Sequence, residues 1–518
     1  MSNRKLRWLG LGLVTTAGAG VLGLSAMMNP AFAHADPPDP PEIIGLVMGG
    51  SGLPIPGSGY VGAANELYID NPLHPNFPGT TYPDPYANGL FTPEGWYPIE
   101  GVHNLYINYP NDADGFSDQS TSVGQGVTIL ENAINSNLTG GAIPQISTVF
   151  GYSQSSIIAS QVMEQLDPTN TPGGSSIPAG DLQFLLIGDP NSPNGGLLER
   201  FNGFETTSGT PVQDELNLPS LGASFDGATP SDSFPTDIYT LEYDGLADFP
   251  RYPIDFLSDL NAVLGLELIH GTYLNGGVDG SGPTVPEIAG ATLLPGSALD
   301  GATDSLTNYY MIDDTAPLVS LLPTQLQELL GPDLTYLINL GYGDGSLGYS
   351  VTPDAPADMA TPFGLFPDVS LSTVLSTLAT DTEQGFENLT SGTDPYSAAV
   401  DATASSATTV PDLMSALEAD AANPAASLTE FVNDISSAAS TLYSTLLPTA
   451  DIINALVTSG PAYYATLFSD NLATGDLTDA IGLPIAADTA LNTLAAGFEF
   501  DVLSSAISAI EADFSGLF

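Results

Sequence analysis

The stretch from residue 146 to residue 166 constrains the fold of this chain more than any other. Its first five residues, Ile-Ser-Thr-Val-Phe, are mostly β-branched or aromatic and predict a buried strand. Gly151 and a lone serine, Ser153, come next. Apolar residues then recur at the spacing of one helix face, at Ile158, Val162 and Leu166. The sequence therefore predicts a strand that turns sharply into a helix, with Ser153 at the turn.

A Gly-x-Ser-x-(small) motif between a strand and a helix is the nucleophile elbow of serine hydrolases. The serine occupies a strained backbone conformation, so the residues two before and two after it must be small for the strand and helix to pass closely. These residues are Gly151 and Ser155, and Ser155 replaces the usual glycine with another small side chain. A helix N-cap that follows a strand is the structural alternative. On the elbow interpretation, Ser153 is the candidate nucleophile.

Strands and helices alternate along the first two thirds of the chain. Continuous apolar runs predict strands at 43–48, 181–187 and 238–243, and an alternating run predicts another at 101–109. A helix with one apolar face over 123–134 precedes the elbow strand. This alternation predicts an α/β-hydrolase type of fold, a mostly parallel sheet with helices on both faces. Sites in such sheets form beyond the carboxyl ends of the strands.

A glycine-rich turn, Gly49-Gly50-Ser51-Gly52, directly follows the first predicted strand. Glycines let backbone N–H groups approach an oxyanion, and the residue after the nucleophile, Gln154, supplies another N–H in this fold. We therefore predict an oxyanion hole from Gly49, Gly50, Ser51 and Gln154. A plain tight turn is the structural alternative. A phosphate-binding loop is disfavoured because no lysine follows the glycines.

The candidate general base is found by elimination. In this fold the triad residues occur in the order serine, acid, histidine. The chain has four histidines, and His34, His74 and His103 all precede Ser153. His270 alone follows it, within Leu-Ile-His-Gly-Thr-Tyr, and is the predicted base, although a lone histidine is often structural.

Three aspartates are candidates for the acid, which would hold the imidazole tautomer and stabilise the imidazolium. Asp244 and Asp248 both follow the strand predicted at 238–243, and Asp189 ends the strand before it. The Gly-x-x-Asp spacing that ends at Asp248 places its carboxylate on the loop beyond the strand. We favour Asp248 as the acid, retain Asp244 as the alternative and expect Asp189 to be structural.

The beginning of the chain is typical of an exported protein. Three basic residues precede a long apolar run, and two Ala-x-Ala triplets follow it. Residues 1–33 are therefore expected to be a signal peptide, and 34–41 a proline-rich linker. An uncleaved anchor is the alternative, because the apolar run is long. The expected location is outside the cell or in the cell envelope.

The charge of the chain excludes one class of function. The chain has 60 acidic residues and five basic ones, which gives a net charge of −55. A surface of this charge repels the phosphates of nucleic acids. Beyond the expected signal the only cations are Arg200 and Arg251. They could clamp a substrate carboxylate, but burial against Glu199 or Asp255 is the favoured interpretation. No cofactor or metal is predicted, because the chain has no HExxH motif, histidine cluster or D-x-D-x-D-G loop.

Several long strings together resemble the PE-PPE domain, a cutinase-like serine α/β-hydrolase domain of mycobacteria and related actinobacteria. These strings are LVMGGSGLPIP (46–56), FGYSQSS (150–156), IGDPNSPNGGLLERF (187–201), YDGLADFPRYPIDFLSDLNAVLG (243–265) and IHGTYL (269–274). The similarity continues through YYMID, LGYGDGSLGY and TPFGLFP, so it covers about residues 42–368. Residues 42–368 are therefore expected to form a hydrolase domain of cutinase-like fold.

The resemblance implies a secreted or envelope-associated esterase or lipase whose substrate is a lipid or another acyl ester. It assigns Ser153 as nucleophile, His270 as base, Asp248 or Asp244 as acid, and the glycine-rich turn as oxyanion loop. Some members are similar to acyltransferases that move fatty acyl groups onto trehalose-type glycolipids, which is the alternative function. A non-catalytic envelope protein that keeps a hydrolase scaffold is a second alternative. Because no N-terminal PE or PPE module precedes the domain, we expect no PE/PPE heterodimer partner.

The last part of the chain, 369–518, is expected to be a helical C-terminal region. Its composition shifts to Ala, Thr, Ser, Leu and Asp. Three stretches carry apolar residues on one helix face: 371–378, 428–435 and 502–510. Turns are expected at Pro411, Pro424, Pro448 and Gly460. We expect these apolar faces to pack helix against helix, and a lid over an acyl pocket is the alternative.

Overall fold

The computed structural model describes most of the chain, in the following segments: residues 43–51, 53, 56–69, 71–73, 87–89, 122–139, 146–167, 177–178, 180–202, 217–218, 223–224, 227–276, 281–302, 305–391 and 446–514. The predicted signal peptide and linker, the strand at 101–109 and the helix at 428–435 lie outside these segments. So do Gly52 and the three histidines that precede Ser153 in the chain.

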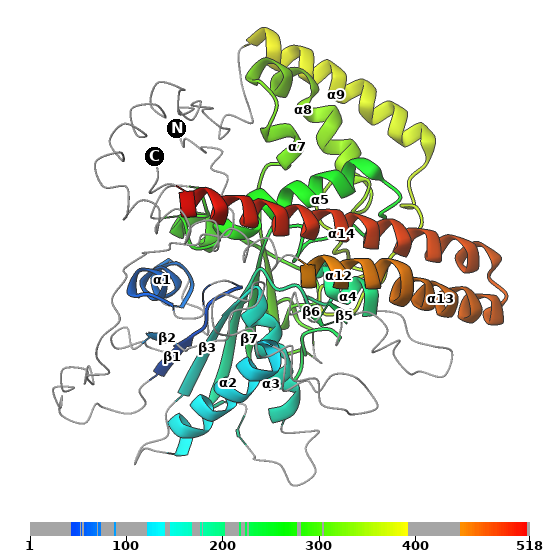
Figure 1. Cartoon of the computed structure of the whole chain (residues 1–518). Helices are drawn as coiled ribbons and strands as arrows, with labels where there is room; N and C mark the ends of the chain where they lie inside the picture. Colours follow the sequence, from blue (N-terminus) through cyan, green and yellow to red (C-terminus); the bar gives the residue numbers. More distant parts are fainter. Residues whose placement is uncertain are drawn as a thin grey trace, which may run out of the picture.

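A seven-stranded sheet forms the centre of the described structure (Figure 1). In spatial order its strands are β2 (Ala87–Gly89), β1 (Ile43–Val47), β3 (Ile146–Tyr152), β4 (Leu182–Ile187), β7 (Thr236–Leu241), β9 (Thr307–Ile312) and β8 (Thr292–Leu293). Every neighbouring pair is parallel except β8 and β9, which are antiparallel. A separate antiparallel pair consists of β5 (Asn217–Leu218) and β6 (Ala223–Ser224). The predicted mostly parallel α/β fold is confirmed.

The inner strands have continuous apolar sequences because both faces of the sheet are covered. All six residues of β4 are buried. Phe184 and Leu186 point into one hydrophobic cluster, and Leu185 and Ile187 point into a second cluster on the other face. β9 lies between β7 and the two-residue edge strand β8, and the sequence did not predict it. Its apolar run, Tyr-Tyr-Met-Ile, is only four residues long and follows two polar residues.

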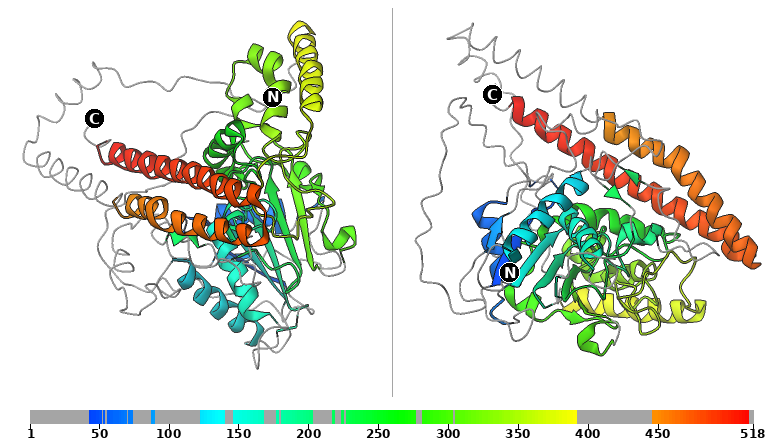
Figure 2. Two further views of the ribbon diagram at one scale, coloured as in Figure 1. Left: turned by 90° about the vertical axis from the view of Figure 1, so that its right-hand side faces the viewer. Right: turned by 90° about the horizontal axis from the view of Figure 1, so that it is seen from below.

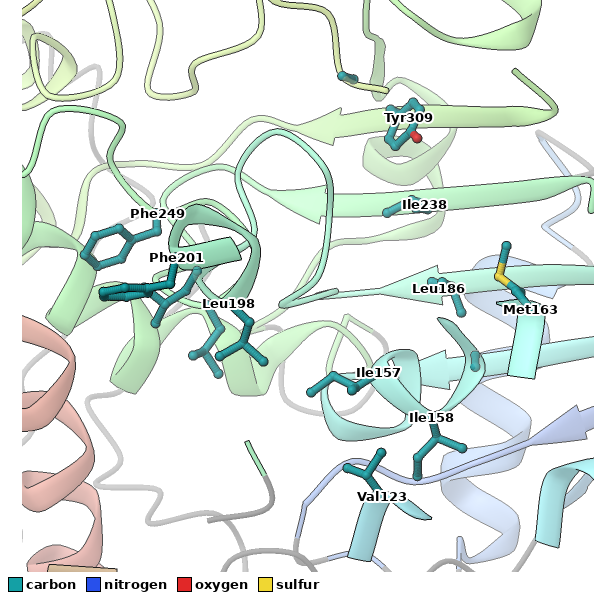
Figure 3. Close-up of a cluster of buried hydrophobic side chains, with 14 of the residues drawn as sticks. Val123, Ile157, Ile158, Met163, Leu186, Leu198, Phe201, Ile238, Phe249 and Tyr309 are labelled. Atoms are coloured by element: carbon teal, nitrogen blue, oxygen red, sulfur yellow. The ribbon is translucent and has the colours of Figure 1, made fainter. Parts of the chain in front are cut away.

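Three helices cover the first face: α2 (Ser122–Thr139), α3 (Gln154–Leu166) and α4 (Leu197–Asn202). Figure 3 shows their apolar side chains, among them Val123, Ile158 and Phe201, gathered over the strands. Gly126 allows α2 to lie directly against α3, because a Cβ at this position would be 2.3 Å from Ile158 Cδ1. The helix predicted over 123–134 and the helix after Ser153 are therefore both present.

The second face is covered by the following elements: α1 (Ser58–Ala64), the π-helical η1 (Asn65–Ile69), the 3-10 helix η5 (His270–Thr272), α6 (Val285–Ala289), α7 (Pro317–Ser320) and α8 (Thr324–Asn339). Large buried tyrosines, including Tyr68, Tyr239 and Tyr273, fill the space between these elements and the sheet. Helix α5 (Phe256–Leu268) leads into η5, and α9 (Leu371–Ser391) packs on α8. A short 3-10 helix, η6, spans Ala298–Asp300.

The C-terminal helices form a long pair that lies side by side (Figure 2). One member runs without a break through α12 (Leu446–Asn454), the π-helical η7 (Ala455–Ser459) and α13 (Gly460–Thr474), and the other is α14 (Leu477–Phe514). The turns predicted at Pro448 and Gly460 are therefore wrong, and those predicted at Pro411 and Pro424 lie outside the described segments. Pro448 is the third residue of its helix, where no intrahelical N–H is needed. Gly460 is required for close packing, since a Cβ there would be 2.7 Å from Leu491 Cδ2.

The C-terminal helices also belong to the core of the hydrolase fold. Leu467, Leu491 and Phe498 are buried in the same hydrophobic cluster as the first face of the sheet. The Tyr463 hydroxyl donates to the Phe201 carbonyl at 2.5 Å, which ties α13 to α4. No helix within the described segments combines the length and the apolar character that a membrane span requires.

Candidate active site

Ser153 lies at the turn between β3 and α3, at the carboxyl end of β3. Its backbone has φ 56° and ψ −117°, a conformation that costs on the order of 1–3 kcal/mol for a residue other than glycine. In the described segments, Tyr243 is the other non-glycine residue with a positive φ, at 65°. The Ser153 N–H donates to the Ile187 carbonyl of the neighbouring strand at 3.2 Å. This hydrogen bond holds the elbow at the carboxyl ends of β3 and β4.

The small residues on either side of Ser153 have distinct roles in the elbow. A Cβ on Gly151 would lie 2.8 Å from the Ser155 carbonyl oxygen and 3.0 Å from Leu186 Cδ2, so only glycine fits. Ser155 does more than leave space. Its Oγ accepts from the Tyr152 N–H at 2.7 Å and lies 3.1 Å from the Tyr152 carbonyl oxygen. This hydrogen bonding closes the turn at a position where a glycine would have no side chain to offer.

His270 faces Ser153 directly. Its Nε2 lies 2.8 Å from Ser153 Oγ, and the imidazole is buried, with 8% of the residue exposed. The Tyr152 hydroxyl donates to the backbone carbonyl of His270, and the two rings pack 5.6 Å apart. Gly188, at φ 53°, makes room for the ring, because a Cβ there would lie 3.2 Å from His270 Cε1. The base candidate is therefore fixed in position from several sides.

Asp244, and not Asp248, carries the carboxylate that meets His270. Asp244 Oδ1 and Oδ2 lie 2.9 Å and 2.8 Å from His270 Nδ1. The Leu246 N–H donates to Oδ1 at 2.9 Å, and Asp244 is completely buried. Ser153, His270 and Asp244 thus form one hydrogen-bonded chain, the arrangement in which an imidazole can take a proton from a serine hydroxyl.

The preference for Asp248 as the acid is corrected by this geometry. Tyr243 adopts the left-handed conformation, and a tight turn follows in which the Asp248 N–H donates to the Asp244 carbonyl at 2.6 Å. The turn directs the Asp248 carboxylate back to the strand end, where it accepts from the Tyr243 N–H at 3.0 Å. Burial raises the pKa of Asp248 well above its usual range, although the Tyr243 N–H opposes this. Spacing alone could not show that the loop turns back.

Asp189 lies at the end of β4 but belongs to the loop that follows. Its Oδ1 accepts from the Asn191 N–H at 3.1 Å and its Oδ2 accepts from the Thr229 hydroxyl at 2.6 Å. Burial raises the pKa of Asp189 to about 6, and these two hydrogen bonds limit the rise. The contacts are those of a structural residue that joins two loops.

The glycine-rich turn after β1 lies beside the elbow. A Cβ built on Gly50 would be 3.5 Å from Ser153 Cβ and 3.4 Å from the Tyr152 carbonyl oxygen. Gly49 closes the turn, since a Cβ there would lie 2.0 Å from the Leu53 carbonyl oxygen. Ser51 is buried, and Gln154 is the first residue of α3. Of the four predicted oxyanion-hole residues, Gly50 and Gln154 therefore lie next to Ser153.

Sequence reasoning missed one side chain of the site, Tyr273. It lies three residues after His270, within IHGTYL, and its hydroxyl donates to Asp244 Oδ2 at 2.7 Å. The Tyr273 oxygen in turn accepts from the Leu241 N–H at 2.9 Å. A tyrosine three residues after the histidine is a weak signal. The spacing does not show that its hydroxyl reaches the Asp244 carboxylate and the end of β7.

Arg200 is a buried structural cation. It donates to the Phe249 carbonyl at 3.3–3.4 Å and to Asn194 Oδ1 at 3.3 Å, and it also reaches the Thr361 carbonyl. Burial lowers its pKa to about 10. The second cation, Arg251, stacks over the Tyr252 ring at 5.5 Å. In the described parts of the chain, no group of three or more His, Asp or Glu residues is placed to hold a metal ion.

Comparison with known proteins gives a consistent assignment. The family model described as "PE-PPE domain" matches residues 83–343. The PPE family protein PPE28 of Mycobacterium tuberculosis is 38% identical over 497 residues, which are 92% of this chain and 67% of that protein. Esterase PE16 of the same organism is 34% identical over 327 residues, 62% of this chain and 51% of that protein. The chain therefore spans between about half and two thirds of these relatives.

Two more distant similarities complete the comparison. Diacyltrehalose acyltransferase Chp2 of M. tuberculosis is 27% identical over 264 residues, 49% of this chain and 65% of that protein. Among solved structures, a cutinase-like protein from Cryptococcus sp. matches 40% of this chain and 80% of its own at 20% identity. Its TM-score of 0.22 is too low to support an inference about function. On the family match and the PPE28 similarity, the chain belongs to the PE-PPE domain family.

Proposed function

We propose that this chain is a serine esterase or lipase that cleaves acyl esters through an acyl-enzyme on Ser153. The observation that carries the proposal is the chain of hydrogen bonds from Ser153 Oγ through His270 to Asp244, at 2.8 Å and 2.8–2.9 Å, on the strained elbow of the sheet. Similarity to a protein named Esterase PE16 supports the same reaction class.

In the proposed first step, Ser153 Oγ attacks the carbonyl carbon of the ester while His270 Nε2 takes the hydroxyl proton. Asp244 holds the tautomer with the proton on Nδ1 and stabilises the imidazolium. The C–O bond to the alcohol then breaks, and the alcohol leaves with the proton from Nε2. Water attacks the acyl-enzyme with His270 as base again, which releases the carboxylic acid and restores Ser153.

The negative charge on the tetrahedral oxygen needs donors on the far side of the carbonyl. The N–H of Gln154, at the start of α3, and the turn from Gly49 to Ser51 are the proposed donors. Their position supports this role, because Gly50 lies beside Ser153 Cβ and the Tyr152 carbonyl, and Gln154 directly follows Ser153 in the chain. The amino end of a helix also favours nearby negative charge.

A fluorophosphonate probe combined with a p-nitrophenyl acyl ester assay tests the proposal. The wild-type chain should hydrolyse the ester and carry one adduct, located on Ser153 by peptide mass analysis. Ser153→Ala should lose both. Ser160→Ala is the matched control, because Ser160 is a buried serine of the same helix whose hydroxyl bonds to the Ser156 carbonyl and to Thr229. Absence of labelling in the wild type would favour the non-catalytic alternative and reject the esterase.

Acyl transfer is a second candidate, favoured by the similarity to a protein named diacyltrehalose acyltransferase. The same acyl-enzyme would serve both reactions, and only the acceptor hydroxyl differs. The test is product analysis of a labelled acyl ester with and without trehalose. New acyl-trehalose and less free acid would establish transfer, whereas free acid unchanged by the sugar would reject it.

A further inference from the structure

Tyr273 contacts the acid of the site through a hydroxyl whose direction is fixed. The residue lies directly after η5 and is completely buried. The Leu241 N–H donates to the Tyr273 oxygen at 2.9 Å. The single proton of the phenol is therefore left for Asp244 Oδ2, at 2.7 Å. A backbone amide at the end of β7 thus sets which way the hydroxyl points.

Each oxygen of Asp244 has a donor of its own in addition to His270 Nδ1, which lies within hydrogen-bond distance of both. Oδ2 faces both the Tyr273 hydroxyl and His270 Nδ1, at 2.7 Å and 2.8 Å. Oδ1 accepts from the Leu246 N–H at 2.9 Å. A carboxylate held by donors at both oxygens cannot rotate freely about its Cβ–Cγ bond. The carboxylate lone pairs therefore stay directed at His270 Nδ1. This favours the imidazole tautomer with its proton on Nδ1, which leaves the lone pair of Nε2 facing Ser153.

The surroundings of Tyr273 keep it a neutral donor and keep its ring in place. Burial, together with the negative charge of Asp244, raises the pKa of the phenol well above its usual range. The ring fits against Gly188, where a Cβ would lie 2.9 Å from Tyr273 Cε2. The Tyr68 hydroxyl donates to the Tyr273 backbone carbonyl at 3.1 Å, from η1 on the same face of the sheet.

We propose that Tyr273 is a positioning residue of the esterase site, which holds the Asp244 carboxylate in the orientation that His270 requires. The inference rests on the proposed function, because it concerns the same three side chains. It goes beyond that function in adding a fourth group, which acts only through Asp244 and does not touch the reacting atoms.

The test compares Tyr273→Phe with Tyr463→Phe in the full chain, because the Tyr463 hydroxyl is also buried but donates to the Phe201 carbonyl, between α13 and α4. Each variant keeps its ring and loses one buried hydroxyl, so similar losses of melting temperature are expected. Only Tyr273→Phe should lower kcat, by about 10- to 100-fold, the range for loss of a hydrogen bond to a charged group. KM should stay within about twofold, because Tyr273 contacts no substrate. An equal loss of kcat in both variants would show that the effect is structural and overturn the proposal.

A double-mutant cycle with Asp244→Asn adds a second readout, measured as the rate of fluorophosphonate labelling of Ser153. If Tyr273 acts through Asp244, Tyr273→Phe should slow labelling in the wild-type background and have no further effect beside Asp244→Asn. Equal slowing in both backgrounds would overturn the proposal. Should Tyr273→Phe fail to fold, 3-fluorotyrosine at position 273 or 463 replaces it. Fluorine makes the phenol a stronger donor, so a change in kcat at 273 that is absent at 463 supports the role, and equal effects at both positions reject it.

Failure of this inference is distinguishable from failure of the esterase proposal. A wild-type chain with no Ser153-dependent labelling would reject the proposed function itself. A wild-type chain that is labelled and active, with Tyr273→Phe indistinguishable from it in kcat, would retain the esterase and reject only the role of Tyr273.

Discussion

Replacing Asp244 by asparagine should disable the site, whereas the same change at Asp248 should not. In Asp244→Asn, an NH₂ group replaces one acceptor oxygen and meets a donor in either orientation, the Leu246 N–H at Oδ1 or the Tyr273 hydroxyl at Oδ2. The NH₂ would also face His270 Nδ1 as a donor, since that nitrogen lies 2.9 Å from Oδ1 and 2.8 Å from Oδ2. The imidazole would then switch to the tautomer that carries its proton on Nε2, facing Ser153, and could no longer act as a base.

The expected magnitude follows from the loss of this tautomer. An Asp→Asn change in a Ser-His-Asp triad lowers kcat by about 10⁴-fold, which corresponds to about 5 kcal/mol in the activation free energy. Asp248→Asn should cost less than about tenfold, because an amide oxygen can still accept from Tyr243 and only one hydrogen bond is altered. Burial already disfavours the charged form of Asp248, so a neutral isostere suits its position.

The assay is steady-state hydrolysis of a short p-nitrophenyl ester, with melting temperatures to confirm that both variants are folded. We expect the kcat values of the two variants to differ by about three orders of magnitude. Asp248→Asn as inactive as Asp244→Asn, or an Asp244→Asn variant near wild-type activity, would refute the assignment of the acid from the hydrogen-bond geometry.

Three further predictions concern the elbow, the pH dependence and the C-terminal helices. Gly151→Ala should destabilise the fold by about 1–3 kcal/mol and abolish fluorophosphonate labelling of Ser153, because the added Cβ would lie 2.8 Å from the Ser155 carbonyl oxygen. Normal labelling of this variant would contradict the close packing of strand and helix at the elbow. Burial raises the pKa of Asp259 to about 8, against about 3.9 when unfolded, so the folded state retains a proton and its stability falls as pH rises between these values. Asp259→Asn should therefore shrink the loss of melting temperature between pH 5 and pH 8, and an unchanged loss would exclude this cause. Leu491→Ala, in a side chain 1% exposed, should cost about 2–5 kcal/mol and lower the single thermal transition of the whole chain; loss of only a minor separate transition would mean that α14 folds apart from the sheet.

Much of the fold could be predicted because its signals are local. The strand–glycine–serine–helix order around Ser153, the apolar runs of β1, β4 and β7, and the amphipathic α2 all follow from neighbours in the chain. Strand β9 was missed because its apolar run is short, and Gly460 was misread as a turn. A glycine in a helix is a break on local grounds, and only its contact with Leu491 of α14 shows why the helix needs it.

Some residues of the site could likewise be predicted from local sequence, and others depended on contacts between distant segments. Ser153 and His270 could be named from the sequence, since one motif and one chain order leave no other histidine after the serine. The choice between Asp244 and Asp248 depended on the positive φ of Tyr243 and the turn that it starts, which no spacing rule contains. Tyr273 depended on an approach between η5 and the ends of strands β4 and β7, again outside any local pattern.

By itself, the sequence determined the elbow and the order of the catalytic candidates, because these depend on residue type and spacing. The tertiary structure alone decided which carboxylate reaches the imidazole, which tyrosine supports that carboxylate and that the C-terminal helices share the core of the sheet. Such contacts join residues far apart in the chain, and their directions are fixed by how loops turn and helices pack.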